Sequence, residues 1–195
     1  DLIRVMAQYP EHIAPHFHLP LQSGSDRILA AMNRRYTTER YLGIVDRLRA
    51  AMPDISLSTD IIVGFPGEDE QDFVQTLDIL RRVRFDTVYA FVYSPRKGTA
   101  AAELPGRISD EEKKDRMNRL LTLQGDISLA CAKRFEGRVL RALVDGPAKS
   151  GESVYSARTA ENRLVHFTSD RDFTGQYVTL QIDRADAFAL YGSLV

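Results

Sequence analysis

The chain has 195 residues, a net charge of −1 and a hydrophobic share of 44%, as is usual for a globular protein with one large or two small domains. Its near-zero charge gives no overall attraction to nucleic acid, and it has no run of the roughly 18 to 20 apolar residues that a membrane-spanning helix needs, so we expect no membrane association. The single cysteine, Cys131, excludes an internal disulfide and a cysteine-built metal site within this chain, and it favours a reducing, cytoplasmic setting.

The first part of the chain alternates between extended and helical segments. Extended runs occupy 16–21, 54–65 and 86–94, and the segments between them repeat apolar residues at three- and four-residue spacing. Such alternation predicts parallel strands connected by helices. Three parallel strands cannot close a barrel, and residues 1–11 have the pattern of a helix end whose strand is missing. We therefore expect the chain to be the C-terminal part of a longer protein.

The first two predicted strands each carry polar groups on one face. His16, His18 and Gln22 alternate with apolar residues in the first, as Ser58 and Asp60 do in the second. A sheet covered by helices on both faces would favour apolar residues on both. The pattern therefore indicates a barrel wall that is apolar toward its helices and partly polar toward a lumen.

Residues 108–136 have the pattern of one long helix. Ser109 is a suitable N-cap, and Glu112 three residues later completes the spacing of a capping box. Cys131 lies on the apolar stripe of this helix, which favours a small core residue over a reactive thiol.

After Gly137 the pattern changes to five short β-like runs separated by turn residues. Short strands at this spacing predict a small closed barrel. We therefore expect two domains, residues 1–136 and residues 137–195.

The turns after the three predicted parallel strands are the candidate ligand site, because ligands bind at the C-terminal ends of such strands. Residues 22–25, 64–68 and 93–99 are rich in glycine, proline and hydroxyl groups, as a closely approached backbone requires. The acidic residues 68–70 at the start of the next helix would repel a phosphate. This turn instead suits a neutral or cationic ligand, such as a base edge or a sulfonium.

For several polar residues, the sequence allows both a structural and a functional interpretation. His16, His18 and Asp60 could suggest a metal site, but without a fixed ligand spacing this is weak evidence. Asp60 is either a satisfied structural acid or a site residue. Residues 137–195 carry as many acidic as basic side chains, so RNA binding by this part requires clustering of the basic ones in the fold.

Three segments in order carry a strong resemblance to the radical S-adenosylmethionine (SAM) methylthiotransferases: HLPLQSGSDRILAAMNRRYT, STDIIVGFPGEDEQDF and FVYSPRKGTAA. The segments YSARTAENRLVHF and FTGQYVTLQI resemble the TRAM domain that follows the radical SAM domain in that family. The likeness covers nearly the whole chain. It implies the C-terminal half of a radical SAM partial TIM-like barrel, followed by a small all-β TRAM barrel that binds RNA.

Within this family, MNRRYT (32–37) looks most like the MiaB-type branch, which adds a methylthio group to position 2 of isopentenyladenosine beside the tRNA anticodon. The branch that acts on threonylcarbamoyladenosine has similar strands and is a close alternative. The branch that acts on a ribosomal protein usually has His where this chain has Ser23, which argues against it.

The resemblance also implies roles for single residues. The tip of the first strand lies by the ribose and methionine part of SAM in radical SAM barrels, which implies SAM contacts for Gln22 and Ser23. The next strand passes the adenine, which implies contacts for Ile62 and Gly64. The other implied site residues are Tyr93 and Ser94 in the same wall, His18 and Asp60 as catalytic residues facing the lumen, and Arg96, Arg158 and Arg163 as RNA-binding residues.

The implied cofactors are SAM and two [4Fe-4S] clusters. One cluster cleaves SAM to a 5′-deoxyadenosyl radical, the second carries sulfur, and another SAM supplies the methyl group. The implied partners are the anticodon stem-loop of tRNA and a sulfur donor, and we expect a monomer. The CxxxCxxC motif is absent from this chain, and one cysteine cannot hold either cluster, so we expect this chain alone to be inactive. A non-catalytic RNA-binding protein is the alternative from another class.

Overall fold

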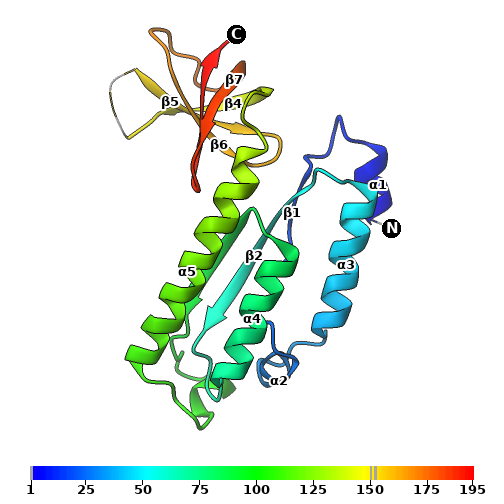
Figure 1. Cartoon of the computed structure of the whole chain (residues 1–195), viewed down its shortest axis with the longest axis vertical. Helices are drawn as coiled ribbons and strands as arrows, with labels where there is room; N and C mark the ends of the chain where they lie inside the picture. The colour runs from blue at the N-terminus through cyan, green and yellow to red at the C-terminus, as the bar shows by residue number, and fades with distance from the viewer. Residues whose placement is uncertain (1, 150, 152) are drawn as a thin grey trace.

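The computed structural model describes residues 2–149, 151 and 153–195, which form a parallel sheet with helices followed by a closed barrel (Figure 1). This arrangement confirms the expected fold class. The elements of the first unit are α1 (Leu2–Gln8), β1 (His16–His18), α2 (Asp26–Ala31), α3 (Thr38–Ala51), β2 (Ser56–Val63), α4 (Glu70–Val83), β3 (Thr87–Val92), the short 3-10 helix Ala100–Glu103 and α5 (Asp110–Lys133).

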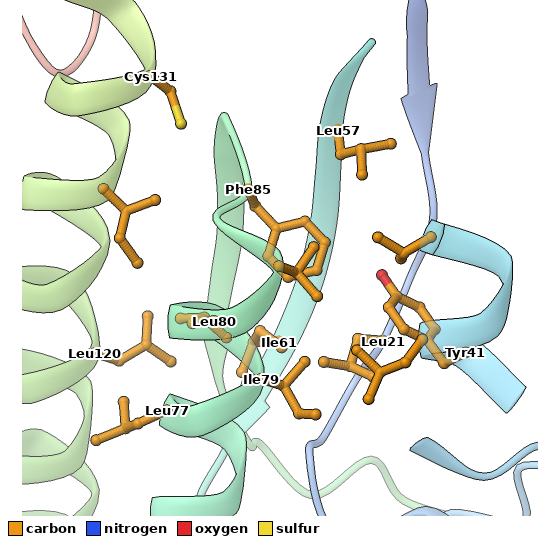
Figure 2. Packing of buried hydrophobic residues seen from close by; sticks show 14 of the residues in the cluster. Leu21, Tyr41, Leu57, Ile61, Leu77, Ile79, Leu80, Phe85, Leu120 and Cys131 are labelled. Atoms are coloured by element: carbon orange, nitrogen blue, oxygen red, sulfur yellow. The ribbon is translucent and has the colours of Figure 1, made fainter. Parts of the chain in front are cut away.

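The sheet has the order β1-β2-β3, and both strand pairs are parallel, as the alternation of strands and helices predicted. Strand β2 places Leu57, Ile61 and Val63 in a hydrophobic core shared with α3, α4 and α5 (Figure 2). Ser58 and Asp60 alternate with these residues and lie on the opposite face. The sheet therefore has one apolar face covered by helices and one face with polar groups, as expected.

Strand β1 is shorter than the predicted extended run. It ends at His18, and Pro20, which has no N–H to donate to the ladder, lies in the break that follows. The chain rejoins the sheet at Gln22, whose N–H donates to the Asp60 carbonyl at 2.8 Å and whose carbonyl accepts the Ile62 N–H at 2.9 Å. These two bonds fix the first strand end beside β2.

The helical stretch between the first two strands consists of two helices, α2 and α3. Helix α2 ends at Ala31, and two residues later Asn33 has a left-handed φ of 57°, which a continuing helix does not allow. Helix α3 begins after Thr37, whose hydroxyl caps it. The division brings Arg34 back to the strand ends, where it contacts Gln22.

The turn between the first strand and α2 is locked against the start of α4. The Gly24 N–H donates to Thr76 Oγ1 at 2.9 Å, and a Cβ on Gly24 would lie 2.4 Å from Thr76 Cα. The Ser25 hydroxyl donates to the Asp72 carboxylate at 2.6 Å, and Arg27 donates to the same carboxylate. Burial raises the pKa of Asp72, but these bonds and a backbone N–H outweigh it and hold the pKa below its ordinary value.

Helix α5 is joined to the loop after β2. Ser109 Oγ accepts the Glu112 N–H at 3.1 Å, so the predicted N-cap is confirmed. The Glu112 carboxylate accepts from Arg116, which is buried and also donates to the Glu68 carboxylate at 2.8 Å. Cys131 packs in the core, where burial raises the pKa of its thiol, as expected for a small core residue.

The second unit is a closed barrel of the order β4-β5-β6-β8-β7. Alternate residues of its strands, such as Leu140, Ala142 and Val144, are buried inside it. The predicted closed barrel of five short strands is confirmed. Its strands are β4 (Val139–Pro147), β5 (Val154–Thr159), β6 (Leu164–Thr168), β7 (Tyr177–Ala185) and β8 (Leu190–Leu194).

The barrel is fastened to the first unit around Asp86. The Asp86 carboxylate accepts the Leu57 N–H at 2.9 Å and the Arg134 guanidinium at 3.0 Å. Arg163 of the barrel donates to the Asp86 carbonyl at 3.3 Å and to the Ser128 carbonyl at 3.5 Å. Because Asp86 directly precedes β3, these bonds place the barrel at the N-terminal end of the sheet (Figure 1).

Gly24→Ala should lower the free energy of unfolding by about 1 to 3 kcal/mol, because the added Cβ meets the backbone of α4. The matched control is Gly43→Ala in α3, where a Cβ has nothing within 4 Å and should stabilise the helix by about 0.5 to 1 kcal/mol. Urea unfolding of both variants measures the difference. Equal effects would contradict the close contact at Gly24.

Candidate functional site

A cavity of about 570 Å³ lies at the C-terminal ends of β2 and β3. This volume falls within the roughly 300 to 1,000 Å³ that is typical of small-molecule sites. The cavity brings together six of the residues predicted from the sequence. They are Gln22, Asp60, Ile62, Tyr93, Ser94 and Arg96.

Gln22 enters the cavity from a strained backbone. Its φ is 70°, in the left-handed region that residues other than glycine rarely adopt, and the side chain amide accepts a bond from Arg34 at 3.1 Å. Backbone strain of this kind costs about 1 to 3 kcal/mol and persists where surrounding contacts impose it, often at functional sites. Here the two backbone bonds to β2 impose it.

His18 and Asp60 lie beside each other on the polar face of the sheet. His18 Nε2 is 3.6 Å from the Asp60 carboxylate, and both side chains are partly exposed. His18 Nδ1 is 3.0 Å from the Ser58 hydroxyl, and its ring packs edge-on to Tyr89. The structure therefore brings the two predicted catalytic residues together, although the cavity is lined by Asp60 and not by His18.

Two of the predicted cofactor-binding residues lie outside this cavity. Ser23 is buried, and its hydroxyl accepts the Ser25 N–H at 3.2 Å, so its side chain stabilises the turn. The predicted contact of Ser23 with SAM stays a prediction. Gly64, with a φ of 77°, lines a neighbouring cavity of about 300 Å³, and a Cβ there would lie 2.5 Å from Lys113. Tyr93 and Ala101 line both cavities.

The three arginines predicted to bind RNA have different surroundings. Arg96 lines the cavity at its rim, and Arg158 is half exposed on the barrel, 3.7 Å from Asp145. Arg163 is only 7% exposed, and two backbone carbonyls of the first unit accept its bonds. The Arg163 side chain is thus mostly buried between the two units, where it lines the cleft beside Arg158, and RNA binding by Arg163 stays a prediction. Burial also lowers the pKa of Arg163 from its ordinary value.

Five further residues line the cavity: Arg34, Phe91, Val92, Thr99 and Ala101. Of these, Thr99 belongs to the turn 93–99 that was predicted as part of the ligand site. Phe91 could have been found, because it pairs in register with Ile62 and shares its face. Nothing in the sequence placed Arg34 there, since its position depends on the break between α2 and α3.

A metal site at His16, His18 and Asp60 is not supported by the structure. Within residues 2–149, 151 and 153–195, no group of three or more His, Cys, Asp and Glu side chains has an arrangement that could hold a metal ion. In the same part of the chain, no helix has both the length and the apolar character needed to cross a membrane.

Fold and site together define a two-part protein with a small-molecule cavity at the ends of parallel strands and an appended β-barrel. Residues 1–80 match the family described as the Radical SAM superfamily. Coproporphyrinogen III oxidase (HemN) from Escherichia coli, a radical SAM enzyme, has a similar fold, with a TM-score of 0.53 at 14% identity over 97% of this chain and 48% of that one.

Curated relatives match the chain along nearly its whole length. The tRNA-2-methylthio-N(6)-dimethylallyladenosine synthase of Carboxydothermus hydrogenoformans is 46% identical over all of this chain and 44% of its own length. The synthase of the same name from Thermoanaerobacter sp. is 44% identical over 95% of this chain and 39% of its own length. The resemblance to the radical SAM methylthiotransferases is thereby confirmed, and the chain spans about two fifths of the relatives that it matches.

Gln22→Gly should leave the free energy of unfolding unchanged or raise it by up to about 1 kcal/mol, because glycine adopts this φ without strain. The variant should nevertheless weaken SAM binding by the full-length protein. Asn162→Gly is the control, since Asn162 has a φ of 62° but lies on the barrel, and SAM binding should not change. A large loss of stability in Gln22→Gly would instead assign its side chain a structural role.

Proposed function

We propose that this chain is part of a radical SAM methylthiotransferase that adds a methylthio group to C2 of isopentenyladenosine beside the tRNA anticodon. The observation that carries the proposal is the identity of 42 to 46% along nearly the whole chain to synthases named for this product. In this proposal residues 1–136 supply one wall of the SAM site, and residues 137–195 form a TRAM domain that binds RNA.

The chemistry of the main cavity suits SAM. The Asp60 carboxylate can pair with a sulfonium or ammonium group, and the amide of Gln22 and the hydroxyl of Ser94 can bond with ribose hydroxyls. Ile62 and Phe91 offer an apolar surface to adenine. When bound, SAM supplies the reactive fragment and the methyl group of this family's chemistry.

The acidic residues at the start of α4 are paired with arginines of this chain. Asp69, the N-cap of α4, lies 3.5 Å from Arg27, and Glu70 in the first turn lies 2.6 Å from Arg119. Glu68 precedes the helix and binds Arg116, in contrast to the expectation that it lies in the first turn.

The residues of this chain do not fit a [4Fe-4S] cluster. Cluster ligation normally needs several thiolates, and the one cysteine, Cys131, is buried in the core away from the cavity. We therefore infer that residues outside this chain hold the clusters and that this chain alone does not carry out the reaction.

The test of the proposed function is nucleoside mass spectrometry of tRNA from cells with and without the full-length gene. Loss of methylthio-isopentenyladenosine, with isopentenyladenosine accumulating, is the expected result. Loss of methylthio-threonylcarbamoyladenosine instead would assign the protein to the alternative branch. If the amount of neither nucleoside changed, the proposed methylthiotransferase activity would be contradicted, and a non-catalytic RNA-binding protein would be favoured.

Arg158→Ala in the full-length protein should weaken tRNA binding and reduce the slope of log affinity against log salt by about 1, as expected for loss of one phosphate contact. Arg81→Ala, which removes an exposed arginine of α4, is the control and should change neither quantity. Binding to labelled tRNA is measured at several salt concentrations. An unchanged slope for Arg158→Ala would contradict the assignment of the barrel surface around it to RNA.

A further inference from the structure

Four polar side chains, His16, Ser58, His18 and Asp60, lie in a row along the polar face of the sheet. The Ser58 hydroxyl lies 3.0 Å from His16 Nε2 and 3.0 Å from His18 Nδ1, so two imidazoles share one hydroxyl. The other nitrogen of His18 lies 3.6 Å from the Asp60 carboxylate. The strand register fixes these distances, because His18 pairs directly with Ser58 and His16 pairs two residues earlier.

The two ends of this row reach different cavities. Asp60 lines the main cavity at the C-terminal ends of the strands. His16 and Ser58 line a second cavity of about 180 Å³ between the sheet and the barrel, together with Arg158 and Phe188. The four side chains therefore join the proposed SAM site to the cleft between the two units.

We propose that His16, Ser58, His18 and Asp60 form a proton relay between the main cavity and this cleft. A serine hydroxyl has one proton and two lone pairs, so it can accept from one imidazole while it donates to the other. The shared hydroxyl gives a proton a path from one imidazole to the other, which two separate hydrogen bonds would not give.

The relay moves one proton without any net chemical change. A proton arriving from the cavity binds His18 Nε2 beside Asp60. The Nδ1 proton of His18 then passes to Ser58 Oγ, and the Ser58 proton passes to His16 Nε2. His16 loses the proton of its other nitrogen to the cleft, and rotation of the hydroxyl with exchange of tautomers restores the starting state.

The surroundings of His16 favour the neutral imidazole that the relay needs. Burial lowers the pKa of His16, Asp86 opposes this effect, and His18 adds to it. A neutral His16 can accept the proton of Ser58 at neutral pH. The other titratable or charged groups that face the relay or line the cleft are Tyr89, Arg134, Arg158, Glu161 and Arg163.

The test uses NMR titration of the His16 and His18 imidazoles in the chain itself, so it is independent of the methylthiotransferase reaction. Asp60→Asn removes the carboxylate beside His18 and should lower the pH midpoint of His16 through the shared Ser58 hydroxyl. When Ser58→Ala is also present, Asp60→Asn should shift the His16 midpoint much less. Ser58→Thr keeps a hydroxyl at this position, so the shift caused by Asp60→Asn should persist.

The matched control is Ser56→Ala, which removes a neighbouring buried hydroxyl of β2 that bonds to Arg134 and not to either histidine of the relay. It should leave the effect of Asp60→Asn on His16 intact. If Ser58→Ala does not fold, His18→Phe breaks the same relay at the next residue and should also remove the effect. The proposed relay is contradicted if Asp60→Asn leaves the pH midpoint of His16 unchanged. It is also contradicted if Asp60→Asn shifts this midpoint equally with and without the Ser58 hydroxyl.

Discussion

The locked turn between the first strand and α2 is the constraint on which the candidate site depends. Gly24 contacts the backbone of Thr76 too closely for any side chain, and Ser25 is bound to Asp72, so the turn cannot move away from α4. Next to this turn, the two backbone bonds to β2 hold Gln22 in its left-handed conformation at the edge of the sheet. The ordinary polar turn residues of the sequence thus fix a strained residue at the mouth of a cavity.

The second constraint lies at the opposite end of the sheet. Asp86 receives bonds from β2 and α5, and Arg163 of the barrel binds the same corner. The barrel therefore lies at the N-terminal ends of the strands, whereas the main cavity lies at their C-terminal ends. The polar face of the sheet runs between these two ends. The histidines of the proposed relay lie on that face.

Local sequence patterns predicted the helices and strands, because the formation of these elements depends on residues that are close in the sequence. Alternation in β2 identified its core face, and the spacing around Ser109 identified the start of α5. Long-range contacts could not be predicted in this way. Arg163 bonds to a carbonyl 77 residues away, and a charged side chain in the sequence does not show whether such a partner will bury it. Arg34 likewise reaches the cavity only because α2 ends early.

The most direct test of the account is the role of Asp60 in SAM cleavage. Formation of 5′-deoxyadenosine by the full-length protein is compared between Asp60→Asn and Asp78→Asn, which changes an exposed aspartate of α4. A hydrogen bond to a charged group contributes about 1.5 to 3 kcal/mol, so Asp60→Asn should reduce the rate by roughly 10- to 100-fold. Asp78→Asn should retain the full rate. Equal rates in the two variants would contradict the assignment of this cavity to SAM.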